Sequence, residues 1–177
     1  MILWDAKTGK AERRLEVDSA EVRSLGFSED GSRLAGGSRG GVIFVWDVPA
    51  GALLRTMTHT HMNFVACVQF SPSNGRCLAT QSGDEIWVWD VDSGEIKMRR
   101  EGCMFAAWSP DGRTLAAVDA MDSHSLLIFD AESGAVRFSM VGHSDDVYTA
   151  SFSVDGSKIA SSCVDGTCKV YPRQCIN

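Results

Sequence analysis

Two histidines separated by one residue, His59 and His61, form the first pair in the sequence whose spacing could bind a metal ion. On a β-strand, side chains two residues apart point to the same face, so both imidazoles could reach one ion. No third ligand stands at a suitable spacing, and His61 has a structural role that is described below. The pair is therefore interpreted as structural, and we expect no metal here.

Other candidates for chemistry also lack the context that their chemistry needs. Cys163, Cys168 and Cys175 have spacings that match no common zinc site. The glycine-rich segment 36–41 joins two expected strands, whereas a phosphate-binding loop joins a strand to a helix. Ser, His and Asp are all present, but no Gly-x-Ser-x-Gly nucleophile motif occurs. We expect no catalytic residue and no cofactor, so the sequence gives no case for an enzyme.

Composition indicates a globular chain of 177 residues, 44% hydrophobic and 23% charged, with one domain as the default. No apolar run approaches the roughly 18 residues of a membrane span, and the N-terminus lacks the features of a signal peptide. These features favour an intracellular protein, in the cytoplasm or nucleus. The six cysteines favour buried side chains over a disulfide framework. A net charge of −6 argues against nucleic acid as the main partner.

An aromatic residue followed by Asp recurs at intervals near 42 residues. The copies are Trp4-Asp5, Trp46-Asp47, Trp89-Asp90 and Phe129-Asp130, and Tyr171 stands 42 residues beyond Phe129. Each Asp precedes a Gly by four residues, as Asp90 precedes Gly94. Asp accepts hydrogen bonds from nearby backbone N–H groups, and Gly adopts positive φ without steric cost. Each copy therefore predicts a hairpin turn between two strands.

A second turn lies midway between successive copies of the first, as in the segment from Ser109 to Gly112. In that segment Pro110 fixes φ for a type I turn and Gly112 takes the left-handed position that follows. The strands that lead into the aromatic-Asp pairs are apolar at every position, which is typical of strands buried on both faces. Four short strands in each unit, without helical periodicity, predict an all-β fold, a β-propeller of four-stranded antiparallel blades.

Over essentially its whole length, the sequence resembles the WD40-repeat family. The resemblance rests on four Trp-Asp-type endings, four Ser-x-Asp/Asn-Gly-type turns and the pair Gly142-His143. It implies about four repeats, with these boundaries: a remnant of a preceding blade at 1–15, blades at 16–57, 58–100 and 101–140, and a last blade at 141–177 without its fourth strand. It also implies a rigid platform whose loops bind other proteins or peptides.

Members of this family often link a His, a Ser or Thr, an Asp and the Trp of one blade by hydrogen bonds. The resemblance places such networks at His61, Thr80, Asp84 and Trp89, and at His143, Ser161, Asp165 and Tyr171. The Tyr171 hydroxyl projects further than an indole N–H, so closure of the second network is left open. The blades that end at Trp46 and Phe129 have Gly36 and Ala117 in place of the hydroxyl residue. We expect apolar packing alone to hold these two blades.

One rim of the expected propeller collects the segments before each first strand and those between second and third strands. Its acidic residues are Glu16, Asp18, Glu21, Asp84, Glu85, Asp119, Asp122, Asp145, Asp146 and Asp165, and Arg39 is its only Lys or Arg. Such a rim favours a Lys- or Arg-rich peptide, although acidic loops also serve solubility. The candidate partner contacts are Asp18, Arg39, Phe64, Asp84, Glu85, Asp122, His124, Asp145 and Asp146. Basic residues concentrate on the fourth strands, as at a solvated sheet edge.

Four blades cover about half of a ring of seven or eight. The sequence therefore predicts a partial or incomplete ring, which belongs to a larger propeller or completes one by self-association. The predicted function is a non-catalytic scaffold for protein–protein interaction, with no nucleic-acid or membrane partner. Two alternatives stay open: a propeller fragment with only a structural role, and an enzyme built on a propeller.

Overall fold

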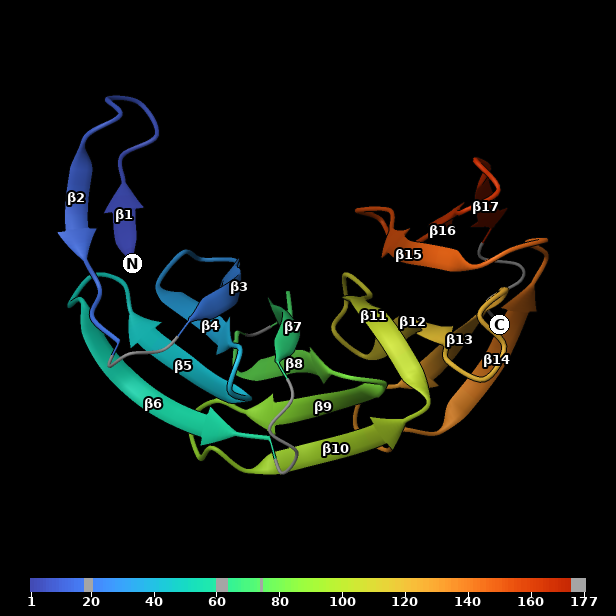
Figure 1. The fold of residues 1–177 in the computed structure, drawn as a ribbon, viewed down its shortest axis with the longest axis horizontal. Coiled ribbons are helices and arrows are strands. Elements are labelled where there is room, and N and C mark those ends of the chain that lie inside the picture. Colours follow the sequence, from blue (N-terminus) through green and yellow to red (C-terminus); the bar gives the residue numbers. More distant parts are fainter. Residues whose placement is uncertain (18–20, 60–63, 74, 173–177) are drawn as a thin grey trace.

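The computed structural model describes residues 1–17, 21–59, 64–73 and 75–172. Within these ranges all regular secondary structure is β-strand. The strands form five antiparallel sheets (Figure 1). One sheet has two strands, β1 (Ile2–Trp4) and β2 (Ala11–Arg14). The other four sheets, numbered blades 1 to 4, are simple meanders in which each strand pairs with the next. This architecture confirms the predicted fold class.

The bounds of the blade strands are as follows. Blade 1 contains β3 (Val22–Phe27), β4 (Arg33–Ser38), β5 (Val42–Asp47) and β6 (Ala52–Thr58). Blade 2 contains β7 (Val65–Phe70), β8 (Cys77–Ser82), β9 (Glu85–Asp90) and β10 (Ile96–Glu101). Blade 3 contains β11 (Cys103–Trp108), β12 (Thr114–Asp119), β13 (Ser125–Asp130) and β14 (Val136–Val141). Blade 4 contains β15 (Val147–Phe152), β16 (Lys158–Cys163) and β17 (Cys168–Pro172).

The sheets follow one another around an open arc (Figure 1). The first strands β3, β7, β11 and β15 lie towards the inside of the arc, and β6, β10 and β14 lie towards the outside. The sheet β1–β2 and blade 4 stand at opposite ends of the arc. The described residues therefore form an incomplete ring of blades.

The repeated Asp–Gly turn between third and fourth strands is closed by its own side chain. Asp90 Oδ1 accepts hydrogen bonds from the backbone N–H groups of Asp92 and Ser93 at 3.0 and 2.9 Å. Gly94 follows with φ of 79° and donates to the carbonyl of Asp90 at 2.8 Å. Asp and Gly thus fix the hairpin that returns the chain to the outer strand.

Apolar cores lie between neighbouring blades, so each blade uses both faces. Ala35 and Val45 of blade 1 share one buried cluster with Val68 and Phe70 of blade 2. The same arrangement joins blade 2 to blade 3, and blade 3 to blade 4. We call the face that a blade turns to the next blade its forward face, and the opposite one its backward face. Burial on both faces explains why the third strands are apolar at every position.

Arginines of the outer strands also join neighbouring sheets. Arg13 Nη1 donates to the carbonyl of Ala50 at 2.8 Å, and Arg100 Nη1 donates to the carbonyl of Gly134 at 3.0 Å. Arg55 makes the corresponding bond to the carbonyl of Asp92. The sequence interpreted these basic residues as a solvated edge, whereas these three side chains fasten one sheet to the next.

Two further features concern the described part of the chain as a whole. It contains no helix with the length and apolar character that a membrane crossing requires. Its five cysteines, at positions 67, 77, 103, 163 and 168, are all free thiols.

Candidate interaction surface

The loops of the predicted rim lie at one end of the sheets, because the strand register places them there. Val65 pairs with Ser82, and Glu85 pairs with Glu101, so the loops next to these residues leave the same edge of blade 2. Backbone hydrogen bonds join successive loops: Cys103 N donates to the carbonyl of Asp84 at 2.9 Å. We call this edge, made by the loops that precede each first strand and those between second and third strands, the loop rim.

Part of the acidic charge predicted on the loop rim is already neutralised. Glu21 forms ion pairs with Arg23 at 2.8 Å and with Arg39 at 3.4 Å. Glu85 accepts hydrogen bonds from Arg99 Nη2 at 2.6 Å and from Trp87 Nε1 at 2.8 Å, and its side chain is only 13% exposed. Glu85 is therefore held inside blade 2. Arg39, in the loop between β4 and β5 of blade 1, is paired with Glu21. Asp84 is exposed, and Asp18 lies outside the described residues.

Four carboxylates of blades 3 and 4 gather on the loop rim, and we call Asp122, Asp145, Asp146 and Asp165 the acidic cluster. All four are exposed. Three loops carry them, and hydrogen bonds join these loops: the Ser123 hydroxyl bonds to Asp146, and the Ser144 hydroxyl donates to Asp165 at 2.8 Å. Within the described residues no Lys or Arg pairs with them; His124 Nε2 lies 3.9 Å from Asp146. Negative charge on this part of the rim is thus free to meet a partner.

Hydrogen bonds keep one member of the cluster ionised. The Thr167 hydroxyl, its backbone N–H and the Ser144 hydroxyl hold the pKa of Asp165 well below its ordinary value. Hydrogen bonds to a carboxylate favour its charged form, so Asp165 is negative throughout the physiological pH range.

Exposed aromatic side chains stand at the inner side of the same rim. Phe64, which the sequence proposed, is 54% exposed. Sequence reasoning missed Phe105 and Tyr148, which are 41% and 59% exposed and lie at irregularities in the pairing of β11 and β15. Phe105 has φ of 54°, an uncommon value for a bulky residue. The signal available in the sequence was an aromatic residue at the second or third position of an expected first strand.

Two groups of side chains have the chemistry of metal ligands. His124, Asp145 and Asp146 place one ligand atom each within 4.8 Å of one another, and so do His143, Cys163 and Asp165. In the second group His143 Nε2 and Ser161 Oγ are hydrogen bonded at 2.7 Å, and Asp165 is bonded to Thr167 and Ser144. These donors are thus already used within the protein. Of the three cysteines considered in the sequence, Cys175 lies outside the described residues.

Blade 2 contains a buried hydrogen-bond network around Thr80. Trp89 Nε1 donates to Thr80 Oγ1 at 2.8 Å, and His59 Nε2 lies 2.9 Å from the same oxygen. The His59 ring also packs against Trp87, with ring centroids 4.5 Å apart. The sequence placed His61 in this position, which lies outside the described residues; the histidine that contacts Thr80 is His59. Residues two apart share a face of an extended chain, so the sequence pattern fits either histidine.

Blade 4 builds a different network around His143. Its Nε2 is 2.7 Å from Ser161 Oγ, and its Nδ1 is 3.4 Å from the hydroxyl of Thr167, which donates to Asp165 at 2.6 Å. The buried hydroxyl of Tyr171 has no hydrogen-bond partner in the described part of the chain. The tyrosine therefore does not join the network that an indole closes in blade 2.

Among the described residues, blades 1 and 3 form no such network. The buried Trp46 Nε1 finds no partner among the described residues, and a Cβ on Gly36 would lie 3.0 Å from Cζ3 of the same ring. In blade 3, Arg100 lies 5.3 Å from the centre of the buried Phe129 ring. Packing, and not a hydroxyl-centred network, surrounds both aromatic residues.

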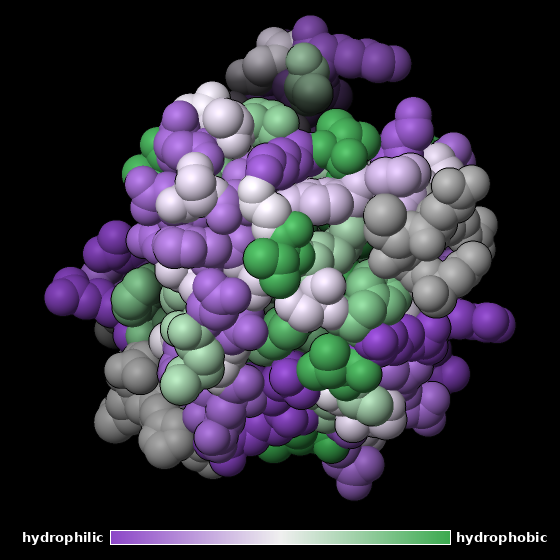
Figure 2. Space-filling view, turned by 90° about the vertical axis from the view of Figure 1, so that its right-hand side faces the viewer, coloured by the Kyte–Doolittle hydropathy of each residue, from purple (hydrophilic) through white to green (hydrophobic). Residues whose placement is uncertain are grey.

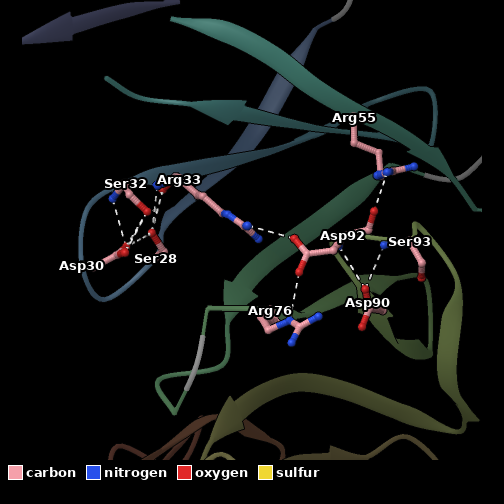
Figure 3. Close-up of polar contacts among 9 residues, drawn as sticks. All are labelled: Ser28, Asp30, Ser32, Arg33, Arg55, Arg76, Asp90, Asp92 and Ser93. Atoms are coloured by element: carbon pink, nitrogen blue, oxygen red, sulfur yellow. Dashed lines mark hydrogen bonds and ion pairs between the residues drawn. The ribbon is translucent and has the colours of Figure 1, made fainter. Parts of the chain in front are cut away.

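An ionic network fastens blades 1 and 2 at the edge opposite the loop rim (Figure 3). Asp92 pairs with Arg33 of blade 1 at 2.8 Å and with Arg76 of its own blade at 2.9 Å. The nearby turn is closed by Asp30, which accepts hydrogen bonds from the hydroxyls of Ser28 and Ser32 at 2.6 and 2.9 Å. These contacts hold the blades in place while the loop rim at the other end stays accessible.

Comparison with known proteins agrees with this architecture. The family model described as WD domain, G-beta repeat (WD40) matches residues 9–47 and 134–171. The chain is 29% identical over 173 residues to "WD repeat-containing protein SL1-17" of Schistosoma mansoni, which covers 97% of this chain and 43% of that protein. It is 27% identical over 188 residues to "Guanine nucleotide-binding protein subunit beta" of Arabidopsis thaliana, which covers 97% of this chain and 50% of that protein. The chain thus spans about half the length of these relatives.

The fold also matches a solved structure described as "Crystal Structure of Mitotic Checkpoint Complex". The superposition has a TM-score of 0.77 and covers 93% of this chain and 53% of the other, at 21% sequence identity. At that identity the likeness is one of fold.

Proposed function

The chain belongs to the WD40-repeat family, and from this premise we propose that it is a non-catalytic scaffold that binds other proteins. Rigid blades that present loops at one edge support this proposal, because loops can make contacts while the sheets hold them in place. The same premise supports a location inside the cell, in the cytoplasm or the nucleus.

We further propose that the partner contributes a segment rich in Lys or Arg, and the acidic cluster supports this. Its four carboxylates are exposed, close together and without Lys or Arg partners among the described residues. A cationic segment would meet an attractive potential there. Tyr148 follows Asp146 by two residues and is exposed, so it can supply apolar contact beside the charges. Asp84 and Phe64 extend the proposed surface towards blade 2.

A peptide-binding assay tests this proposal. Fluorescence anisotropy would compare a labelled Lys/Arg-rich peptide with a Glu-rich peptide of the same length. We expect the basic peptide alone to bind, and its affinity to fall as ionic strength rises. The double variant Asp122→Lys/Asp145→Lys should lose at least about tenfold in affinity, since close charge pairs are worth on the order of 1–2 kcal/mol or more.

The matched control is Glu29→Lys/Glu95→Lys, which makes two charge reversals at exposed positions on the edge opposite the loop rim, in blades 1 and 2. This variant should bind the basic peptide as the wild type does. Equal binding by the double variant and the wild type would contradict the role of the acidic cluster.

A further inference from the structure

A pocket of about 280 Å³ opens between blades 2 and 3, at the edge opposite the loop rim. Three of its lining residues are apolar: Val88 on the forward face of blade 2, Trp108 on the backward face of blade 3, and Ala131. All three are at most 6% exposed. Pockets for drug-sized ligands are mostly larger, about 300–1,000 Å³, so this one has room for a single large side chain.

The strand register shows why the pocket is open. Arg33 of blade 1 and Cys77 of blade 2 are equivalent, because each begins the second strand of its blade and pairs with the Asp that follows the aromatic residue. Arg33 crosses the junction between blades 1 and 2 and pairs with Asp92 at 2.8 Å (Figure 3). Cys77 is too short to reach in the same way towards Glu132, the residue equivalent to Asp92. An ionic contact at the first junction is thus replaced by a pocket at the second.

The pocket combines its apolar residues with cations from both blades. Lys97 lies on β10, with Nζ 3.8 Å from Cys77 Sγ, and Arg113 lies in the turn between β11 and β12. Both residues are exposed, and neither forms an ion pair within 4 Å in the described part of the chain. Arg137, the third cation of the lining, is paired with Asp130 at 2.8 Å. Lys97 and Arg113 are therefore available to an anionic group.

Neither end of the arc contributes to this pocket. Figure 2 shows apolar side chains, bordered by polar ones, on the face at the blade 4 end. Blades 2 and 3 lie away from both ends, each has four strands, and a described blade stands on either side of the pair (Figure 1). The shape and charge of the pocket are thus properties of an internal blade junction.

We propose that this pocket binds a second kind of partner segment, in which a large apolar side chain is followed by acidic residues. The apolar side chain enters the pocket beside Trp108, as an anchor does at a protein interface. The carboxylates that follow meet Lys97 and Arg113, since ammonium and guanidinium groups form strong hydrogen bonds with carboxylates. Three basic residues outnumber the two acidic ones, Asp130 and Glu132, in the lining. The chain thereby holds an acidic segment at the edge opposite the acidic cluster.

Fluorescence anisotropy with the labelled peptide Ser-Gly-Phe-Glu-Glu-Gly-Ser tests the proposal. A matched peptide with Ala in place of Phe should bind at least about tenfold more weakly, because it lacks the apolar anchor. A matched peptide with Gln in place of both Glu should bind about fivefold more weakly, on the scale of two partly exposed ion pairs. The Glu-rich peptide of the first assay has no apolar anchor and should not bind. Equal binding by the three matched peptides would overturn the proposal.

Cys77→Arg is the sharpest variant, because it places in blade 2 the side chain that crosses the junction from blade 1. The longer side chain fills the pocket and can pair with Glu132. Binding of the peptide with Phe and Glu should therefore fall at least about tenfold, while circular dichroism stays that of the wild type. A folded Cys77→Arg variant that binds this peptide as the wild type does would contradict the proposal.

Lys97→Ala and Arg113→Ala test the charges at exposed positions, where the fold should tolerate the change. Each should weaken binding about threefold. Lys10→Ala is the matched control, since Lys10 is an exposed cation at the same edge, in the turn between β1 and β2. It should bind as the wild type does. No binding by the wild type, or an equal loss with Lys10→Ala, would also overturn the proposal.

This pocket is separate from the acidic cluster, so the two proposals can fail independently. The variant Asp122→Lys/Asp145→Lys should bind the peptide with Phe and Glu as the wild type does, and Cys77→Arg should still bind the Lys/Arg-rich peptide.

Discussion

Trp89 donates its indole N–H to the hydroxyl of Thr80 at 2.8 Å, and both side chains are buried. The same hydroxyl contacts His59, so one oxygen on β8 ties together the third strand and the segment that enters the blade. Trp46 occupies the equivalent place in blade 1, where Gly36 lies against its ring, and the Trp46 N–H has no partner among the described residues. Blade 2 is thus fixed by polar contacts where blade 1 relies on packing.

Replacing Thr80 by Val should destabilise the fold by about 2–3 kcal/mol, because it leaves the Trp89 N–H and a His59 ring nitrogen without this oxygen in a buried site. Urea unfolding followed by tryptophan fluorescence would measure the free energy of unfolding. Thr80→Ser keeps the hydroxyl and should lose less. Ser161→Ala in blade 4 should also lose less, because Ser161 serves His143 but no indole. Equal losses for Thr80→Val and Thr80→Ser would show that packing, not the hydrogen bonds, matters here.

The repeat period was sufficient to predict the strands and the two kinds of turn, because each turn is determined by local residues such as Asp90 and Gly94. Contacts that depend on strand register were harder to predict from the sequence. Two histidines at i and i+2 lie on the same face of an extended segment, so the sequence alone could not choose between His59 and His61. Glu85 looked accessible because it begins a strand at the rim, yet Arg99 lies across the sheet from Trp87, and together they enclose its carboxylate.

Removing the negative charge of Asp92 should weaken the link between blades 1 and 2. Asp92→Asn loses the ion pairs with Arg33 and Arg76, while the Arg55 bond to the backbone carbonyl remains. Because the groups are partly exposed, we expect a loss of about 1 kcal/mol at low salt and little difference at 1 M salt, on the scale of such pairs. Urea unfolding at both salt concentrations would measure it. Glu95→Gln, at an exposed carboxylate close by, is the control; an equal effect there would contradict the specific role of Asp92.

Acid should destabilise the turns at Asp30 and Asp155. Hydrogen bonds from Ser28 and Ser153, with further bonds from Ser32 and Ser157, lower the pKa of each carboxyl from 3.8 to about 2. A depressed folded-state pKa means that the ionised group stabilises the fold above pH 3.8, and that this contribution is lost as pH falls towards about 2. The variant Asp30→Asn/Asp155→Asn should therefore show a shallower fall of the urea midpoint across this range. Glu29→Gln should keep the wild-type slope, and an unchanged slope in the double variant would contradict the assignment.

Substitutions at Gly51 and Gly9 can distinguish the cost of backbone strain from the cost of side-chain crowding. The two glycines have nearly the same left-handed φ, 69° and 67°. A Cβ on Gly9 would meet nothing within 4 Å, whereas one on Gly51 would lie 2.6 Å from Arg13 Cδ. Gly9→Ala should therefore lose about 1 kcal/mol for the left-handed backbone alone. Gly51→Ala should lose roughly 0.5–1 kcal/mol more, since it displaces Arg13 from the carbonyl of Ala50. In an Arg13→Ala background the two glycine substitutions should become equal, because the crowding and the bond to the next sheet are then both absent. If the difference survives in that background, measured by urea unfolding, Arg13 does not fasten the sheet β1–β2 to blade 1.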